Sequence, residues 1–407
     1  MRSFRTLDDL PAEQRVLVRL DLNSPVEDGV VQDNRRFSRH AVTVSELAET
    51  GHRIALMAHQ GRPGRDTFVS LEQHADILAE HAGVDVDFVA DTFGDETLAA
   101  VRDLDAGDVL LLENTRMTDD ELPEKEPEEH ADSDFVRTLA PEFDAYVNDA
   151  YSAAHRKHAS LVGFPLRLPS YAGRVMQTEY EANTAIAERE FDGDVTMVVG
   201  GTKATDVIGV MEALDEKVDR FLLGGVAGEL FLRAAGYPVG EDVDTELFDE
   251  QWDANEETIR SVLEERREQV TLASDLAYED AEGERAEIDM DDIVEKTQAF
   301  LDIGSGTVAD YEPAIRDSEA VFVKGALGVF EDERFSVGTV GVLEAIADTD
   351  CFSVVGGGDT SRAITMYGMA EDDFSHVSIA GGAYIRALTG EPLPAVELLI
   401  RSAERDA

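Results

Sequence analysis

Arginines in the first half of the chain follow short apolar segments that are typical of buried strands. They are Arg19, Arg36, Arg62, Arg116 and Arg156. The carboxyl ends of parallel strands meet at one edge of a sheet, and ligands bind there. A guanidinium group holds a phosphate or a carboxylate by two parallel hydrogen bonds. One such arginine would more often pair with a surface acid, but five in this position predict a site for a small, multiply charged anion.

Glycine-rich turns take the corresponding places in the second half of the chain. They are GGTKATD (200–206), LLGGVAGE (222–229), DIGSGT (302–307), VKGALGVFE (323–331) and GGGDTSRA (356–363). Glycines that open helices present backbone N–H groups that suit nucleotide phosphates, although a single such loop is often only a tight turn. The sequence has no GxxxxGK[ST] motif, and no GxGxxG follows the first strand. A P-loop protein is therefore excluded, and a dinucleotide-dependent dehydrogenase has little support.

Three of the charged side chains in these glycine loops are candidates for contact with a nucleotide or its metal. Only six of the 35 basic residues are lysines, and two of the six are Lys203 and Lys324, placed where an ammonium group can meet a phosphate. Asp359 follows three consecutive glycines. Mg²⁺ is usually held by one or two carboxylates together with phosphates, so Asp359 is a candidate ligand for Mg²⁺ that arrives with a nucleotide. Capping a helix is its alternative role, and the two roles are compatible.

Alternating apolar and amphipathic segments predict the elements that position these residues. In the first half, strands are expected at 15–22, 52–59, 84–91, 107–114 and 143–150, with helices at 38–51 and 70–83. In the second half, strands are expected at 195–201, 220–225, 271–276, 319–325 and 351–358. A long amphipathic stretch at 170–190 predicts a connecting helix. Strand and helix alternate, which indicates an α/β protein with two doubly wound parallel sheets.

The charge balance excludes several classes of partner. The 407 residues include 87 Asp and Glu against 35 Lys and Arg, for a formal net charge of −52. A surface this negative repels nucleic acids and anionic membranes. The single cysteine, Cys351, rules out a disulfide framework and indicates a reducing compartment. No signal-peptide core and no long apolar run occurs, so we expect a soluble cytoplasmic protein of two or three domains.

Ten motifs in a fixed order resemble those of the phosphoglycerate kinase family, over nearly the whole chain. They are RLDLNSP, the Arg36 segment, HQGRP, LLENTRM, VNDAYSAAHRKHAS, VVGGTK, LDIGSGT, KGALGVFE, VVGGGDT and SHVSIAGGA. The resemblance implies two Rossmann-like domains that face a cleft. Residues 1–169 would bind phosphoglycerate, 170–190 would form the connecting helix, and 191–387 would bind the nucleotide. Composition assigns the tail 388–407 to neither half, and the resemblance implies that it packs on the first domain.

The resemblance implies a glycolytic and gluconeogenic phosphotransferase that uses a carboxyl group as acceptor. Its reversible, Mg²⁺-dependent reaction transfers a phosphoryl group between 1,3-bisphosphoglycerate and ADP, giving 3-phosphoglycerate and ATP. The residues that would bind phosphoglycerate are Asp21, Asn23, Arg36, His59, Arg62, Arg116 and Arg156. Those that would serve the nucleotide are Lys203, Lys324, Glu331, Gly357, Gly358, Asp359 and Thr360, with Glu331 on the ribose and Asp359 on the metal.

Phosphoryl transfer of this kind requires alignment and positive charge rather than a general acid. The leaving group is a carboxylate, which is already a stable anion. Arg36 and Lys203 are the candidates for stabilising the moving group, one from each domain. Because the resemblance divides the two substrates between domains, it also implies that domain closure aligns them and excludes water.

The sequence departs from the family pattern in the second half. The position four residues after Lys203 commonly carries a second lysine and is Val207 here, while Lys324 stands where asparagine is usual. We hypothesise that Lys324 supplies the charge missing at position 207. The segment Ser378–Gly382 differs from the usual Ser-Thr-Gly-Gly-Gly, so no phosphate contact is carried over to it.

A non-catalytic sensor of the same ligands is the alternative to an enzyme. A sensor could lose any of Arg36, Lys203 and Asp359, and all three are present, which favours the enzyme. The sequence does not give the oligomeric state, and we expect a monomer with a dimer as the alternative. The partners expected are therefore small molecules, namely phosphoglycerate and adenine nucleotides.

The excess of acidic residues also bears on the conditions that the protein needs. Acids make up more than one fifth of the chain and lie along its whole length. At ordinary ionic strength such a surface repels itself and opposes compaction. At molar salt the Debye length falls to about 3 Å, and the repulsion is largely screened. The composition is therefore typical of a halophile with concentrated cytoplasmic salt, and an ordinary acidic protein is the less favoured alternative.

We expect the protein to unfold or lose activity when it is moved from molar KCl into dilute buffer, because the screening of its acids is lost. Circular dichroism across a KCl series measures this directly. Full stability at about 0.1 M salt would contradict the halophilic interpretation.

Overall fold

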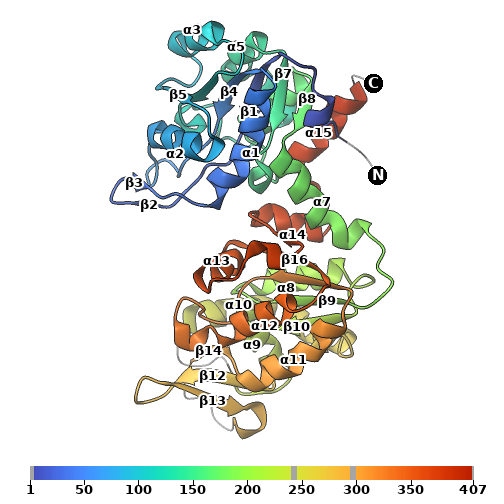
Figure 1. Cartoon of the computed structure of the whole chain (residues 1–407). Coiled ribbons are helices and arrows are strands. Elements are labelled where there is room, and N and C mark those ends of the chain that lie inside the picture. The colour runs from blue at the N-terminus through green and yellow to red at the C-terminus, as the bar shows by residue number, and fades with distance from the viewer. Residues whose placement is uncertain (1–3, 240–244, 294–298, 406–407) are drawn as a thin grey trace. The chain divides into compact units, whose positions relative to one another are not determined.

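The chain divides into two compact units, each described here by itself. The computed structural model describes residues 4–239, 245–293 and 299–405 (Figure 1). The first unit comprises Met1–Glu181 together with Glu391–Ala407, and the second comprises Ala182–Gly390. The division falls within helix α7 (Arg174–Glu188), which begins in the first unit and continues into the second.

The first unit contains a six-stranded parallel sheet in the order β5-β6-β4-β1-β7-β8. Its strands are β1 (Arg15–Arg19), β4 (Arg53–Met57), β5 (Val86–Val89), β6 (Val109–Leu112), β7 (Ala145–Asn148) and β8 (Ser170–Ala172). Its helices are α1 (Arg35–Glu49), α2 (Glu72–Ala82), α3 (Asp95–Asp103), α4 (Pro127–Ala131), α5 (Asp134–Leu139), α6 (Ala159–Val162) and α15 (Pro394–Arg405). A short hairpin joins β2 (Val26–Glu27) to β3 (Val30–Val31).

Both faces of this sheet are buried, which explains why its strands are continuous apolar segments. Successive side chains of a strand point to opposite faces. Val16 and Val18 of β1 therefore pack with Phe37 of α1 in one apolar cluster, while Leu17 packs with Phe135 of α5 in another. This packing fixes β1 between two layers, so that the loop after it leaves the sheet at a defined place.

The second unit contains a parallel sheet in the order β11-β10-β9-β15-β16-β17. Its strands are β9 (Val195–Val199), β10 (Arg220–Leu223), β11 (Val270–Thr271), β15 (Ala320–Lys324), β16 (Phe352–Gly356) and β17 (His376–Val377). In chain order this is 3-2-1-4-5-6, the Rossmann arrangement, in which ligands bind where the strand order reverses. The reversal lies between β9 and β15.

Helices cover this second sheet, and a small antiparallel sheet accompanies it. The helices are α8 (Ala204–Ala213), α9 (Gly225–Ala234), α10 (Thr245–Glu265), α11 (Ser305–Asp317), α12 (Val337–Ala347), α13 (Gly358–Met366) and α14 (Gly382–Leu388). The small sheet has the order β13-β12-β14, formed by β12 (Asp275–Glu279), β13 (Arg285–Asp289) and β14 (Phe300–Ile303). The predicted α/β fold class with two doubly wound sheets is thus confirmed.

Two elements differ from the sequence-based expectation. The helix expected at 170–190 begins only at Arg174, because 170–172 pair with β7 as the edge strand β8. The strand expected at 271–276 is divided between β11 and β12, which belong to different sheets. The Thr307 hydroxyl accepts the backbone N–H groups of Ser274 and Asp275, both at 3.0 Å, where β12 begins.

The last helix belongs with the first unit. In Figure 1, α15 lies beside β8, and the Ser402 hydroxyl accepts the backbone N–H of Ser170 at 3.0 Å. The α15 backbone N–H of Ala395 donates to the carbonyl of Ala154 at 3.1 Å. Within the described part of the chain, no helix is both long enough and apolar enough to cross a membrane.

Candidate active site

A cavity of about 570 Å³ lies at the carboxyl ends of the strands in the first unit. Five arginines line it, and none of the described residues that line it is acidic. The arginines are Arg36, Arg62, Arg65, Arg116 and Arg156. The other lining residues are Asn23, Ser24, Pro25, Asn34, His59, Gln60, Gly61 and Thr67. The cavity therefore suits an anion with several negative charges.

Three of these guanidinium groups have no partner in the part of the chain that the structure describes. Those of Arg62, Arg65 and Arg156 make no hydrogen bond or ion pair with any residue in the described ranges. The chain has 87 acidic residues, so partners are plentiful elsewhere on it. Keeping acids out of this cavity leaves the three side chains available to a ligand.

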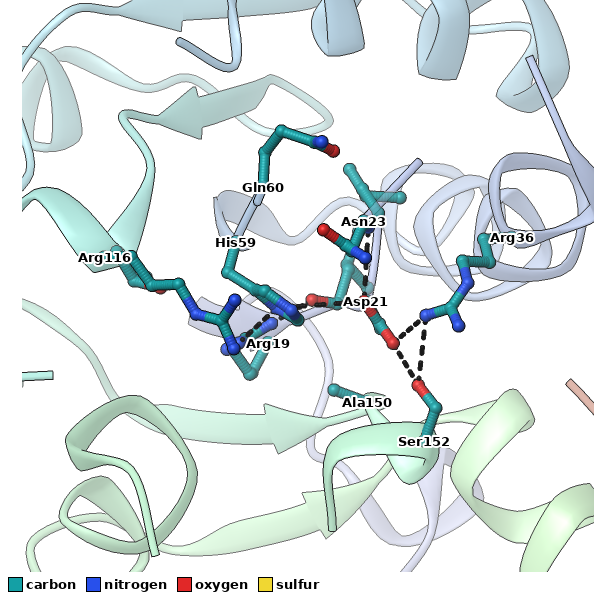
Figure 2. Close-up of polar contacts among 12 residues, drawn as sticks. Arg19, Asp21, Asn23, Arg36, His59, Gln60, Arg116, Ala150 and Ser152 are labelled. Carbon is teal, nitrogen blue, oxygen red and sulfur yellow. Dashed lines mark hydrogen bonds and ion pairs between the residues drawn. The ribbon is translucent and has the colours of Figure 1, made fainter. Parts of the chain in front are cut away.

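Asp21 orients Arg36 at one side of the cavity. Asp21 follows β1, and Arg36 lies in the first turn of α1, whose N-cap Asn34 accepts the backbone N–H of Arg36 at 2.9 Å. One Asp21 oxygen accepts from Arg36 and from the hydroxyl of Ser152, and Figure 2 shows these two side chains converging on it. Burial alone would raise the pKa of Asp21, but the Arg36 charge and the Ser152 hydrogen bond hold it well below its usual range. Asp21 is therefore an anion that orients Arg36.

His59 presents a neutral ring to the same cavity. Burial, with the neighbouring charges of Arg19 and Arg116, holds the pKa of His59 well below its usual range, despite the opposing effect of Asp21. Arg19 has only donors, and its Nη2 lies 3.1 Å from His59 Nδ1, so Nδ1 accepts and Nε2 carries the hydrogen. His59 can thus donate one hydrogen bond to a bound anion from Nε2.

Arg19 does not line the cavity, although its position at the end of β1 placed it among the candidate arginines. It is fully buried, and its Nε donates to the hydroxyl of Ser160 at 2.8 Å. Its Nη2 lies 3.8 Å from a carboxylate oxygen of Glu121. Arg19 therefore supports His59 from behind and has no direct access to a ligand.

The loop after β4 carries Arg62 to the cavity and holds Arg116, which follows β6. The backbone N–H of Gly61 donates to Asn23 Oδ1 at 2.8 Å, and the carbonyl of Gly61 accepts from Arg116. Gly61 has φ of +64°, and a Cβ there would lie 2.2 Å from the carbonyl oxygen of Thr67, so only glycine fits. Burial, followed by the charges of Arg19 and Arg156, lowers the pKa of Arg116 to about 10, which leaves it charged at neutral pH.

The structure adds residues that the sequence argument missed. Arg65 lines the cavity, and its backbone N–H donates to the carbonyl of Arg62 at 3.0 Å. The turn RPGR, with two arginines three residues apart, was the signal that could have revealed it. Gln60 is fully buried and holds Ser24 from both sides, by accepting its N–H at 2.8 Å and donating to its carbonyl at 2.9 Å. No pattern in the sequence marks that role.

A second cavity, of about 260 Å³, lies in the second unit where the strand order reverses. Apolar side chains form much of its wall, and glycines that follow β9, β10 and β15 also line it. The apolar residues include Leu223, Leu232, Leu276, Ile303, Leu327 and Phe330, and the glycines include Gly201, Gly224, Gly225 and Gly328. An apolar cavity suits an aromatic base, and the exposed backbone N–H groups of glycine turns suit the phosphates attached to such a base.

The residues predicted to serve a nucleotide are distributed around this second cavity. Glu331 and Asp359 line it. Lys203 is the exposed N-cap residue of α8, outside the cavity lining. The other predicted residues, also outside the lining, are Gly357, Gly358 and Thr360 at the start of α13 and Lys324 at the end of β15. Gly357 has φ of +106°, a conformation that favours glycine.

Lys324 is the most enclosed of these charges. Its side chain is 11% exposed, and its ammonium group lies 3.2 Å from Asp206 Oδ2. Asp206 precedes Val207 on α8, and Val207 itself is fully buried in the core. The Lys324 ammonium group therefore lies beside the residue that precedes position 207, near the Gly201 turn.

The residues of this unit fit a metal that is bound mainly through a nucleotide. Asp359 is exposed in the first turn of α13, and its carboxylate has no bonded partner among the residues described. Across the described ranges, no group of three or more His, Cys, Asp and Glu residues could hold a metal ion. One carboxylate without a bonded partner in the described ranges, beside a glycine turn, matches the way proteins usually hold Mg²⁺ together with phosphates.

His74 makes the region of Gln60 sensitive to acid. Its Nε2 lies 3.1 Å from Gln60 Oε1, and its buried Nδ1 has no partner among the described residues. Burial lowers the pKa of His74 to about 4 from its ordinary 6.5. The unfolded chain therefore takes up this proton at higher pH than the folded protein, and the contribution of His74 to stability falls as the pH drops from 6.5 to 4.

We expect the wild type to lose more free energy of unfolding between pH 7 and pH 4.5 than His74→Leu, by up to about 3 kcal/mol. Urea unfolding at constant molar KCl measures both losses, and subtraction removes the contributions of the other histidines. Equal losses in the two proteins would show that His74 does not titrate in this range.

Comparison with known proteins identifies relatives over the whole chain. A model of the family described as phosphoglycerate kinase matches residues 7–391. The phosphoglycerate kinase of Halorubrum lacusprofundi is 76% identical over 406 residues and is covered over 100% of both chains. That of Haloarcula marismortui is 73% identical, over 98% of this chain and 100% of the relative. These haloarchaeal relatives confirm the prediction of a halophilic protein.

Solved structures give the same result. The phosphoglycerate kinase of Pyrococcus horikoshii matches with a TM-score of 0.91 and 32% identity, over 99% of this chain and 100% of that one. The enzyme of Coxiella burnetii matches with a TM-score of 0.82 and 28% identity, over 98% of this chain and 100% of that one. The chain belongs to the phosphoglycerate kinase family.

Proposed function

We propose that the chain transfers a phosphoryl group reversibly between 1,3-bisphosphoglycerate and ADP, with Mg²⁺, and so yields 3-phosphoglycerate and ATP. Membership of the family gives the reaction class. The observation that carries the assignment of the substrate is the cavity lined by five arginines, which no described acidic residue lines in a chain of net charge −52. A small anion with a phosphate and a carboxylate is the ligand that such a cavity suits.

The proposed phosphoglycerate site consists of Asp21, Asn23, Arg36, His59, Arg62, Arg116 and Arg156, with Arg65 added from the cavity lining. Arg62, Arg65 and Arg156, whose guanidinium groups have no partner among the described residues, are free to contact the anion directly. Asp21 and Asn23 act differently. Asp21 holds Arg36, and Asn23 holds Gly61, so both support groups that contact the ligand.

The proposed chemistry needs little proton transfer. The bond between phosphorus and the acyl oxygen breaks, the carboxylate leaves, and a terminal phosphate oxygen of ADP forms the new bond to phosphorus. Arg36, with its side chain 26% exposed at the cavity, and Lys203, exposed at the start of α8, are the proposed sources of positive charge for the moving group. Because the two proposed sites belong to different units, transfer requires a conformation that aligns the two ligands.

The proposed nucleotide site uses the second cavity and the turns around it. The apolar wall takes the base, Glu331 bonds the ribose, and the glycine turns that contain Gly357 and Gly358 receive phosphates, with Thr360 fixing the turn. The hydroxyl of Thr360 donates to the carbonyl of Gly356 at 2.9 Å. Asp359 would hold Mg²⁺, which neutralises phosphate charge when it is bound.

The position of Lys324 supports its proposed role as a substitute for a lysine at 207. Its ammonium group is bonded to Asp206 and lies near the Gly201 turn, so a nucleotide phosphate there would find a cation that the chain already holds in place. A charged hydrogen bond of this kind is worth about 1.5–3 kcal/mol.

The test of the proposed function is ATP consumption that depends on 3-phosphoglycerate, with Mg²⁺, over a KCl series. We expect Arg36→Ala to lower kcat on the order of a hundredfold or more while the KM for ATP changes little, since Arg36 contacts the moving group. Arg53→Ala is the control, because Arg53 lies at the opposite end of the strands.

Equal losses in kcat and in nucleotide affinity would assign Arg36 to binding instead of catalysis. If folded wild-type protein shows no turnover at any KCl concentration, the enzyme is excluded and the non-catalytic sensor becomes the better account.

We expect Lys324→Met to weaken ADP binding by about tenfold or more, because the variant keeps the volume of the side chain and loses its charge. Isothermal titration with Mg-ADP in molar KCl gives the dissociation constant. Lys217→Met is the matched control, since Lys217 pairs with the exposed Glu190 at 3.2 Å. An unchanged dissociation constant for Lys324→Met would contradict the hypothesis that Lys324 supplies the charge missing at position 207.

A further inference from the structure

A buried histidine and a buried aspartate connect the phosphoglycerate site to helix α7. His40 lies on α1, and Asp149 follows β7, and both are fully buried. The mechanism proposed above uses neither of them. We propose that His40 and Asp149 are positioning residues that connect the Asp21 loop (residues 20–25, between β1 and β2) to the first turn of α7, so that a ligand that orders Asp21 and Arg36 also orders the start of α7. The proposal rests on the proposed function of the arginine cavity.

The connection begins at the backbone of Asp21. Its N–H donates to His40 Nε2 at 3.3 Å, while the side chain of Asp21 holds Arg36. A buried backbone N–H needs an acceptor, and His40 supplies it across the space between β1 and α1. Because Nε2 accepts, the ring hydrogen lies on Nδ1.

The second bond of His40 leads away from the cavity. Its Nδ1 donates to Asp149 Oδ2 at 2.8 Å. The other oxygen of Asp149 accepts the backbone N–H groups of Val175 and Met176 at 2.8 and 3.1 Å. These are N–H groups of the first turn of α7, where a carboxylate is stabilised by the helix dipole. The path from Arg36 to α7 therefore consists of consecutive hydrogen bonds through buried groups.

Two further features fix this path in place. A Cβ at position 173 would lie 2.2 Å from Asp149 Oδ1, so Gly173 allows the carboxylate to approach the start of α7 closely. The backbone N–H of Arg174 donates to the Thr43 hydroxyl at 3.0 Å, and the Arg174 guanidinium bonds both oxygens of Glu46, at 2.8 and 2.6 Å. Arg36, His40 and Thr43 lie on one face of α1, by the spacing of a helix. One face of α1 thus presents Arg36 to the cavity at one end and, one to two turns further along, contacts the start of α7.

The chain contains matched histidines that lack this connection. His52 and His130 are also buried and also accept a backbone N–H, from Gln14 at 3.1 Å and from Lys125 at 3.3 Å. Neither lines the arginine cavity, and neither is hydrogen-bonded to α7 within the described residues. Substitutions of His52 or His130 therefore serve as controls. They measure the effect of losing a buried histidine while the proposed connection to α7 stays intact.

The first test follows amide hydrogen exchange of the full protein in molar KCl, with and without 3-phosphoglycerate. In the wild type we expect the ligand to slow exchange in the Asp21 loop and also at Val175 and Met176. In His40→Leu we expect slower exchange in the Asp21 loop only. His40→Gln should restore the effect at 175 and 176, because an amide donates and accepts at a spacing similar to that of the two ring nitrogens.

The second test is steady-state kinetics of the same variants. We expect His40→Leu to lower kcat on the order of tenfold with little change in the KM for ATP, as a small misplacement of a binding group would. His52→Leu should keep the wild-type kcat. If His40→Leu does not fold, Asp149→Asn breaks the same path at one bond, and it should likewise abolish the ligand effect at 175 and 176.

Two outcomes would overturn this inference. Slower exchange at Val175 and Met176 in both His40→Leu and Asp149→Asn would show that the ligand acts on α7 by another route. An equal decrease of kcat in His52→Leu and His40→Leu would show that His40 has only a structural role. If 3-phosphoglycerate does not slow exchange in the Asp21 loop of the wild type, the proposed function fails, and the inference falls with it.

Discussion

The repulsion among five guanidinium groups is the constraint on which the site depends. Cations gathered in one cavity oppose their own assembly. Burial, together with the charges of Arg19 behind the cavity and Arg156 within it, lowers the pKa of Arg116 to about 10. The compensating carboxylates, Asp21 and Glu121, are buried behind the cavity, and no described acid lines it. The buried carboxylates thus stabilise the arginines from behind, and the faces of the arginines that line the cavity remain available to an anionic ligand.

The parallel sheet makes this arrangement possible. Its strands are buried on both faces and all end at the same edge, so that loops distant in sequence bring their side chains together. Buried histidines then take the place of acids as partners for polar groups. His59 accepts from Arg19, and His40 accepts from the backbone of Asp21, and neither places a negative charge in the cavity. A neutral acceptor suits a site that must remain positive.

Much of the fold and part of the site could be predicted from the sequence. The strands of the parallel sheets are continuous apolar segments, and arginines or glycines follow them, so their types and approximate positions were predictable. The β12–β13 hairpin was not, because β13 is acidic and has no buried residue, so that it resembles a solvated charged segment. Gln60 and Ser152 were missed because only tertiary contacts bring them to Ser24 and to Asp21, whereas the RPGR turn offered a sequence signal for Arg65. Arg19 was misjudged because the strand end gives its position along the chain and not the direction of its side chain.

The most direct test of this account is a crystal structure grown in molar salt with 3-phosphoglycerate and Mg-ADP. The account predicts a phosphoglycerate anion in contact with Arg62, Arg116 and Arg156 in the first unit. It predicts the adenine ring against the apolar wall beside Leu327 and Phe330 in the second, with phosphates at the glycine turns. A phosphoglycerate bound outside the arginine cavity, or a nucleotide whose base lies away from that wall, would contradict it.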